Sequence, residues 1–345
     1  MNDDDNDDDD ACQKFIDLFS NICVKENHDG ILLSGGLDSS IIAYHTRPTN
    51  SITITIDKNS PDYFYSSLIV KKKFTMNHYK IIVSFEEILA NIEELVKDFK
   101  TFDPIFLKNS VVQLMGFKTA KDLDINSLVL GDGADELFAG YNFLLLNRYV
   151  NQPIKIQQKI NSIIKNMDFI SLKLSKKIGL KIFLPFLEKE IVDFSHKIPL
   201  NNKISTHNGI YYGKFFLRKC YEDILGKEIV WRKKTPLEIG SGVTNLQSHI
   251  ENNLMTNDNY DGEYIKEIKK IRMEEKVEIR NKEHLYFYKM YRKFYCPPIE
   301  DKSTYLEKDI RKCPHCQSNF IWNGSFCNVC GAFPVHIIKK DENEN

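Results

Sequence analysis

Apolar and polar residues follow two alternating patterns along the first 130 residues of the chain. Short apolar or β-branched runs bounded by turn residues predict strands, and longer stretches with helical spacing of apolar residues predict helices. The strands are expected over residues 30–33, 51–57, 79–84 and 127–131, and the helices over residues 11–25, 65–77, 86–99 and a stretch ending near residue 120. Strands alternating with helices predict an α/β fold with a parallel, doubly wound sheet, which binds ligands at the carboxyl ends of its strands.

Beyond this region the pattern changes. From residue 141 to about residue 295 the β signal fades, and amphipathic stretches predict a helical C-terminal half. Pro297 and Pro298, with the charged stretch that follows them, indicate a linker. The expected organisation is a disordered acidic tail (1–10), one α/β domain (11–295), a linker (296–312), a small cysteine module (313–335) and a polar tail (336–345).

The composition is that of a globular protein, with 42% hydrophobic and 28% charged residues. No stretch approaches the roughly 18–20 apolar residues of a membrane span, and no signal peptide opens the chain. We therefore expect a cytoplasmic location and no membrane partner. Seven of the first ten residues are aspartates, a run that is typical of a disordered, solvated segment. The remainder is mildly basic, which suits a protein that handles polyphosphate.

The stretch after the first expected strand has the chemistry of a phosphate site. Ser34-Gly-Gly-Leu-Asp-Ser-Ser40 joins an apolar run to the start of a helix. Glycines allow close backbone approach, and a helix N-terminus presents N–H groups to an anion. The carboxylate of Asp38 suits such a place only if a divalent cation lies between it and the anion. The stretch lacks the Gly-Lys-Ser/Thr ending of a Walker loop and the third glycine of a dinucleotide fingerprint.

A second cluster follows the fourth expected strand. Asp132, Asp135 and Glu136 stand within five residues and would repel one another unless a cation or a basic group lay among them. Because both clusters follow parallel strands, we expect Asp38 and Asp135 to meet at one edge of the sheet and to hold one Mg²⁺.

These motifs resemble those of a known family. Ser34–Ser40 looks like the PP-loop of the ATP pyrophosphatases, enzymes that cleave ATP to AMP and pyrophosphate. Gly131–Tyr141 is similar to the second signature of the synthetase domain of asparagine synthetases, a domain that also occurs in β-lactam synthetases. Further segments agree in order between about residues 25 and 295, namely Ser60–Asp62, Thr101–Asp103, Phe183–Glu188, Lys214–Arg218, Trp231–Lys234 and Gly240–Gly242.

The resemblance implies an adenine nucleotide α-hydrolase-like fold and an ATP-dependent amide ligase of the asparagine synthetase type. Such an enzyme converts a carboxylate into an acyl-adenylate with release of pyrophosphate, and ammonia or an amine then displaces AMP. The residues that would hold the pyrophosphate are Ser34, Gly35, Gly36, Asp38, Ser39 and Ser40. Those that would border the rest of the nucleotide are Leu32, Thr55, Leu130 and Gly131.

The resemblance also implies roles for charged residues. Asp38 and Asp135 would be the Mg²⁺ ligands, and Lys214 and Lys234 would neutralise charge on the phosphates. Lys233 stands beside Lys234, so the register of that lysine is open by one residue. Asp132 takes the place of a carboxylate, often glutamate, that handles the proton of the incoming nucleophile.

Two features depart from this family. Its glutamine-dependent members begin with a glutaminase domain whose catalytic cysteine follows the initiator methionine, whereas Asn2 stands here. We therefore expect free ammonia, a separate amidotransferase or another amine as the nitrogen source.

The second feature is the spacing Cys-x2-Cys-x10-Cys-x2-Cys of Cys313, Cys316, Cys327 and Cys330. It predicts a structural Zn²⁺ ribbon, whose partner could be a protein, a carrier or RNA.

Two alternatives stay open at this point. Some tRNA thiolases join a PP-loop domain to zinc modules, but they generally use additional cysteines near the PP-loop. The other cysteines here form no paired motif, so nucleic acid is not the expected partner; they are Cys12, Cys23, Cys220 and Cys296. A non-catalytic ATP-binding adaptor is the second alternative, and the intact acidic and lysine motifs argue against it.

Overall fold

The computed structural model describes residues 3–145, 152–165, 167–255, 260–298, 310–312 and 319–321. The chain divides into two compact units, one formed by residues 1–83 and 112–243 and the other by residues 84–111 and 244–345. Each unit thus combines two separate segments of the chain. Among the described helices, none is long and apolar enough to cross a bilayer.

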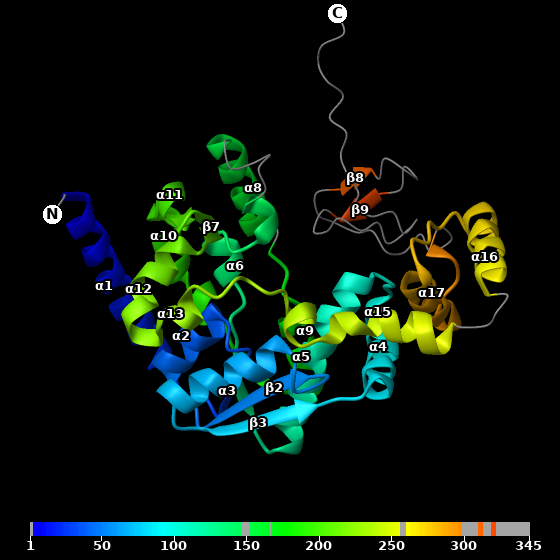
Figure 1. Cartoon of the computed structure of the whole chain (residues 1–345), viewed down its shortest axis with the longest axis horizontal. Helices are drawn as coiled ribbons and strands as arrows, with labels where there is room; N and C mark the ends of the chain where they lie inside the picture. The colour runs from blue at the N-terminus through cyan, green and yellow to red at the C-terminus, as the bar shows by residue number, and fades with distance from the viewer. Residues whose placement is uncertain are drawn as a thin grey trace, which may run out of the picture. The chain divides into compact units, whose positions relative to one another are not determined.

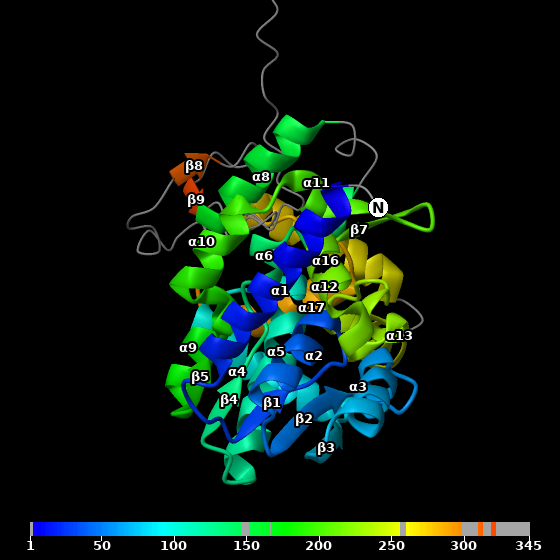
Figure 2. The same ribbon diagram turned by 90° about the vertical axis from the view of Figure 1, so that its left-hand side faces the viewer.

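A five-stranded sheet of order β3-β2-β1-β4-β5 lies in the first unit (Figure 2). All of its strand pairs are parallel. The strands are β1 (Gly30–Leu32), β2 (Asn50–Thr55), β3 (Asn77–Ile82), β4 (Ser127–Val129) and β5 (Lys181–Phe183). The predicted α/β class and the first four strands are confirmed. The chain order reverses between β1 and β4, so the loops after these two strands flank the point at which such sheets bind ligands.

The C-terminal half contains strands that were not predicted. β5 has only three residues, too few to show a periodicity. β6 (Ile204–His207) and β7 (Ile210–Gly213) form an antiparallel hairpin. Its turn residues Asn208 and Gly209 have φ values of 51° and 76°. An Asn-Gly pair is the strongest short-range signal of a hairpin, so this motif could have been located from the sequence.

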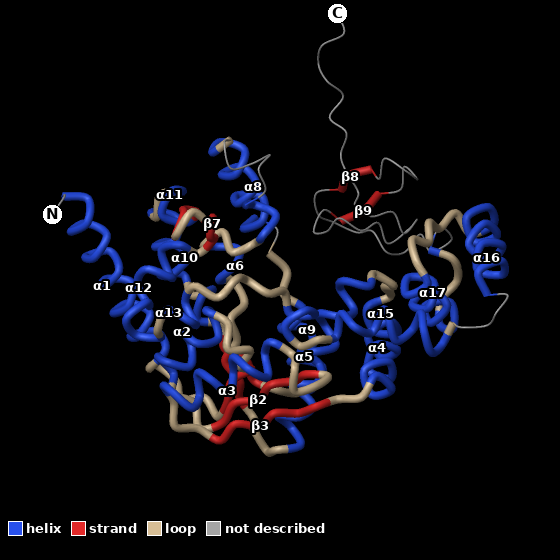
Figure 3. Tube along the Cα trace, viewed as in Figure 1, coloured by secondary structure: helices blue, strands red, loops and turns tan. Residues whose placement is uncertain are grey.

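Helices make up most of the remaining described residues (Figure 3). Those of the first unit are α1 (Asp3–Cys23), α2 (Leu37–Thr46), α3 (Pro61–Lys73), α6 (Ala134–Leu137), η1 (Asn142–Leu145), α8 (Pro153–Lys165), α9 (Ile170–Ile178), η2 (Pro185–Leu187), α10 (Lys189–Lys197), α11 (Leu200–Lys203), α12 (Phe215–Leu225), α13 (Lys227–Val230) and α14 (Leu237–Gly240). Those of the second unit are α4 (Phe85–Phe99), α15 (Leu246–His249), η4 (Ile250–Leu254), α16 (Tyr260–Glu274) and α17 (Lys282–Phe294). The segments α5 (Pro104–Asp122) and η3 (Val243–Asn245) contain unit boundaries, and β8 (Ile310–Lys312) pairs with β9 (Asn319–Ile321).

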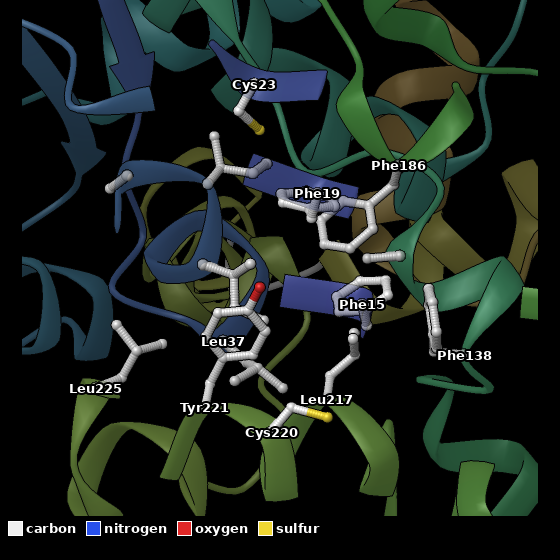
Figure 4. Close-up of a cluster of buried hydrophobic side chains, with 14 of the residues drawn as sticks. Phe15, Phe19, Cys23, Leu37, Phe138, Phe186, Leu217, Cys220, Tyr221 and Leu225 are labelled. Carbon is white, nitrogen blue, oxygen red and sulfur yellow. The ribbon is translucent and has the colours of Figure 1, made fainter. Parts of the chain in front are cut away.

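The N-terminal helix begins earlier than its apolar pattern predicts. α1 starts at Asp3, so the aspartate run that we expected to be a disordered tail lies within a helix. Packing of its apolar face accounts for the helix. Phe15 and Phe19 are fully buried, and their ring centroids lie 5.6 Å from Phe138 and 4.7 Å from Phe186, respectively (Figure 4).

A disulfide between Cys12 and Cys220 ties α1 to α12, and the two helices lie side by side in Figure 1. The two cysteines are 208 residues apart in the sequence, and no spacing motif predicts such a distant pair. The bond anchors the N-terminal helix to the helix that begins directly after Lys214.

Replacing Cys12 and Cys220 together by serine is expected to lower the free energy of unfolding by about 2–5 kcal/mol, because the disulfide restricts the unfolded chain. Urea unfolding of the oxidised proteins measures the difference. Cys296→Ser is the matched control, since the Cys296 thiol is free and exposed. A double variant as stable as the wild type would show that the two cysteines are not linked.

The second unit has a buried core of its own. The ammonium of Lys108 lies 3.0 Å from the carboxylate of Glu283, and these side chains are only 8% and 2% exposed. Phe102 is fully buried and contacts the rings of His284 and Tyr288. Thr101–Asp103, one of the segments that carry the family resemblance, therefore contributes to this core.

Candidate active site

The turn from β1 into α2 is shaped by two glycines. Gly35 has a φ of 66°, and a Cβ there would lie 2.3 Å from the backbone carbon of Tyr65, so only glycine fits. Gly36 caps α2 without a side-chain hydrogen bond. The Ser34 hydroxyl accepts from the Gly36 N–H at 3.2 Å and lies 3.2 Å from the Ser39 hydroxyl. The first turn of α2 thus follows directly on a glycine turn, an arrangement that can present backbone N–H groups to an anion.

Two carboxylates and two ammonium groups converge beside this turn. The Lys214 Nζ lies 2.6 Å from Asp38 Oδ2 and also pairs with Asp135. The other carboxylate oxygen of Asp135 pairs with Lys234. The Lys214 ammonium therefore lies between the two carboxylates. Sequence reasoning expected all four side chains at one site, and the structure brings them together.

The backbone of Lys214 is held in an unusual conformation. Its φ is 54°, a left-handed value that is uncommon for residues other than glycine and often marks a functional site. The side chain is 2% exposed. A Cβ at Gly140 would lie 2.2 Å from Lys214 Cε and 1.9 Å from Asp135 Oδ1. Gly140 therefore leaves the space into which the lysine and the aspartate fit.

Electrostatics favour the charged forms of this pair. Burial alone would raise the pKa of Asp135, but the ammonium groups of Lys214 and Lys234 outweigh it and hold that pKa well below its usual range. Burial also opposes the charged form of Lys214, yet Asp135 and Asp38 raise its pKa. Asp135 and Lys214 are therefore both ionised at neutral pH.

Of the two adjacent lysines, Lys234 is the one that contacts the acidic cluster. Lys234 reaches Asp135, whereas the side chain of Lys233 is exposed. The carbonyl of Lys234 accepts a hydrogen bond from the Asn142 side chain at 3.4 Å. Lys233 is thus a matched control position beside a residue of the cluster.

Asp132 has a different environment from Asp135. The hydroxyl of Ser171, on α9, donates a hydrogen bond to its carboxylate. Burial raises the pKa of Asp132 to about 6, and neighbouring carboxylates act in the same direction. Glu136 accepts a hydrogen bond from the Tyr141 hydroxyl. Sequence reasoning missed Ser171, because no motif marks a lone serine in an amphipathic helix.

The pKa of Asp132 predicts a pH-dependent stability. In the unfolded chain an aspartate ionises near pH 4, whereas Asp132 in the folded protein keeps its proton up to about pH 6. The folded state therefore binds more protons in this window, and its stability falls as the pH rises. Asp132→Asn has no carboxyl group to ionise at this position, so its stability does not fall in this way as the pH rises.

We expect Asp132→Asn to be about 1–3 kcal/mol more stable than the wild type at pH 8 and to lose that advantage near pH 4. Urea unfolding in EDTA at both pH values measures the difference. A stability difference that does not change with pH would contradict the raised pKa.

The residues expected to border the nucleotide lie at the carboxyl ends of three neighbouring strands. Leu32 ends β1 and is half-buried, and Thr55 ends β2 and is fully buried. The Thr55 hydroxyl has no hydrogen-bond partner among the described residues. Leu130 and Gly131 follow β4, and a Cβ at Gly131 would lie 3.1 Å from Asp38 Cβ. The loop after β4 therefore packs directly on the loop after β1.

The predicted zinc ligands Cys313, Cys316, Cys327 and Cys330 lie outside the described residues. Within the part of the chain that the structure describes, no group of three or more His, Cys, Asp or Glu side chains could hold a metal ion. Asp38 and Asp135, beside the turn from β1 into α2, supply only two carboxylates.

The sequence model of the asparagine synthase family matches residues 21–166 and 172–284, which is well over half of the chain and includes both loops of the site. The chain belongs to the asparagine synthase family. It is similar to a probable glutamine-hydrolyzing asparagine synthetase of Acanthamoeba polyphaga mimivirus, with 29% identity over 218 residues, 59% of this chain and 38% of the relative.

Relatives from cellular organisms have similar sequence identities to this chain and cover similar shares of it. The chain is 27% identical over 228 residues to a glutamine-hydrolyzing asparagine synthetase of Gallus gallus, covering 61% of this chain and 39% of the relative. It is 24% identical over 233 residues to asparagine synthetase B of Escherichia coli K12, and the match covers 62% of this chain and 41% of the relative. The chain therefore spans about two fifths of the length of these curated relatives.

Proposed function

We propose that this protein is an ATP-dependent ligase that adenylates a substrate carboxylate and transfers the acyl group to ammonia or an amine. The observation that carries the proposal is the convergence of Asp38, Asp135, Lys214 and Lys234 beside the PP-loop. This cluster lies where the strand order of the sheet reverses, which is the ligand position in doubly wound folds. Membership of the asparagine synthase family supports the reaction class.

The aspartate pair fits Mg²⁺. Asp38 Oδ1 is buried and has no hydrogen-bond partner among the described residues, so one carboxylate oxygen is left for a ligand. Carboxylate oxygens are preferred ligands of Mg²⁺, which usually binds one or two of them together with substrate phosphates. Asp38 and Asp135 would hold Mg²⁺ there, and the cation would neutralise negative charge on the leaving pyrophosphate.

The chain's own groups would assist the first step as follows. A substrate carboxylate oxygen attacks the α-phosphorus of ATP, and the bond from that phosphorus to the pyrophosphate oxygen breaks. Backbone donors of the turn and the N-terminus of α2 would bind the departing pyrophosphate. Lys214 and Lys234 would stabilise the negative charge that develops on the phosphate oxygens. The side chain of Lys234 is 25% exposed, so it is accessible to a ligand, whereas Lys214 is enclosed.

Asp132 would act in the second step. With its pKa raised to about 6, the carboxylate is mostly ionised at neutral pH yet basic enough to accept a proton. The nitrogen nucleophile attacks the acyl carbon, AMP leaves, and Asp132 would take the proton that the nitrogen loses. The hydrogen bond from Ser171 fixes the orientation of this carboxylate.

A pyrophosphate-release assay tests the proposal. ATP and Mg²⁺ are supplied with aspartate and ammonium, then with a panel of other carboxylic acids, and in a separate arm with tRNA. We expect release of pyrophosphate that requires a carboxylic acid, with AMP formed in equal amount. Release without any acid, or only with tRNA, would overturn the proposal.

A further inference from the structure

Arg232 links the segment that carries Lys234 to the PP-loop. One guanidinium nitrogen donates to the Ser34 carbonyl at 3.2 Å, and another donates to the Asp62 carboxylate at 3.0 Å. The guanidinium also lies 4.0 Å from the centre of the Tyr65 ring. The side chains of Arg232 and Asp62 are each 7% exposed. The contacts of Arg232 therefore go to the protein itself, and its position is fixed on three sides.

The segment around Arg232 is anchored from its other side as well. Arg218, on α12, donates to the carbonyls of Val230 and Arg232, the second at 3.1 Å. A Cβ at Gly240 would lie 2.5 Å from both carboxylate oxygens of Asp62, so the chain after Lys234 also packs closely on this carboxylate. The Arg232 backbone is thus held in place while its side chain holds the Ser34 carbonyl.

The hydrogen bond from Arg232 to the Ser34 carbonyl also sets the direction of the Gly35 N–H, which belongs to the same peptide group. The C=O and N–H groups of a trans peptide point in opposite directions, so the Ser34 carbonyl that faces Arg232 turns the Gly35 N–H away from Arg232. That N–H has no hydrogen-bond partner among the described residues. The peptide before a glycine with positive φ rotates easily, because glycine also accepts negative φ. An outside contact is needed to keep one orientation.

We propose that Arg232 is a positioning residue that orients the Ser34–Gly35 peptide so that the Gly35 N–H donates to the pyrophosphate portion of ATP. This inference rests on the proposed function and adds a residue to its anion site. Without Arg232 the peptide is free to turn and to present a carbonyl oxygen to the anion, which repels it. Arg232 itself need not touch the ligand.

The test compares two probes, inorganic pyrophosphate with Mg²⁺ and adenosine, by calorimetric titration of the full chain. For Arg232→Met we expect the pyrophosphate affinity to fall about 10- to 100-fold, since one donor is lost and an acceptor replaces it. Adenosine affinity is expected to stay within about twofold, because the turn does not bind the base. Lys233→Met, at the exposed neighbouring position, is the control and should leave both affinities unchanged.

Arg232→Lys separates positioning from charge and covers the case in which Arg232→Met does not fold. A lysine keeps the charge but has no planar fork to join Ser34 to Asp62, so we expect a loss of at least about fivefold for pyrophosphate. Unchanged pyrophosphate affinity in either folded variant, or parallel losses for both probes, would overturn the inference. If the wild type binds neither probe, the proposed function itself fails.

Discussion

Asp38→Asn is expected to lower the rate of pyrophosphate release from ATP by about 10³-fold, since it removes a proposed negatively charged ligand of Mg²⁺ beside the leaving pyrophosphate. Lys214 keeps its contact with Asp135 in this variant, so the buried ammonium stays paired and the fold is retained. Steady-state pyrophosphate release over a range of Mg²⁺ concentrations measures the loss and shows whether more Mg²⁺ restores part of the rate.

Asp223→Asn is the matched control, because Asp223 is exposed on α12 and lies outside the cluster. It should keep the wild-type rate. A fully active Asp38→Asn protein with unchanged Mg²⁺ dependence would show that the metal is held elsewhere and would contradict the assigned site.

Lys234→Ala is expected to lower kcat for pyrophosphate release by about 10²- to 10³-fold with a small change in the KM for ATP. In the proposed mechanism the Lys234 ammonium stabilises charge that develops mainly in the transition state. Asp135 keeps its pairing with Lys214, so the variant should stay folded. Steady-state kinetics with varied ATP separates kcat from KM.

Lys233→Ala gives the comparison at the neighbouring exposed position, and we expect its kinetics to stay within about twofold of the wild type. Equal decreases of kcat in Lys233→Ala and Lys234→Ala would mean that the reaction depends on positive charge near the site and does not depend on the specific contact of Lys234 with Asp135. A loss confined to Lys233→Ala would show that the register is shifted by one residue.

Local sequence signals sufficed for the parts of the fold that place the site. The short strands β1 (Gly30–Leu32) and β4 (Ser127–Val129) are apolar and are followed by small and acidic residues. Both signals lie within a few neighbouring positions of the sequence. Two parallel strands then bring their following loops to one edge of the sheet, which is why the meeting of Asp38 and Asp135 could be predicted.

Features that depend on distant contacts could not be predicted. The Cys12–Cys220 disulfide joins positions 208 residues apart, and the Ser171 hydrogen bond to Asp132 spans 39 residues. Neither serine nor cysteine carries a spacing signal over such a separation. The pairing of Arg232 with Asp62 spans 170 residues and is equally invisible to local patterns.

Helix α1 shows the limit of composition as a guide. An aspartate run is typical of a disordered segment, but the helix starts within that run, at Asp3, ahead of its buried apolar face. The buried apolar face that anchors this helix lies further along it and is not visible in the charge of the run. The division into two interleaved units likewise depends on contacts between segments that are far apart in the sequence.

The most direct test of carboxylate adenylation follows oxygen atoms. Aspartate, or whichever acid supports pyrophosphate release, is labelled with ¹⁸O in the reacting carboxylate and incubated with ATP, Mg²⁺ and ammonium, and the AMP formed is analysed by mass spectrometry. If an acyl-adenylate forms and ammonia displaces AMP, each AMP carries one ¹⁸O atom from the acid. AMP that contains no label from the acid, or that takes its new oxygen from labelled water, would contradict the proposed reaction.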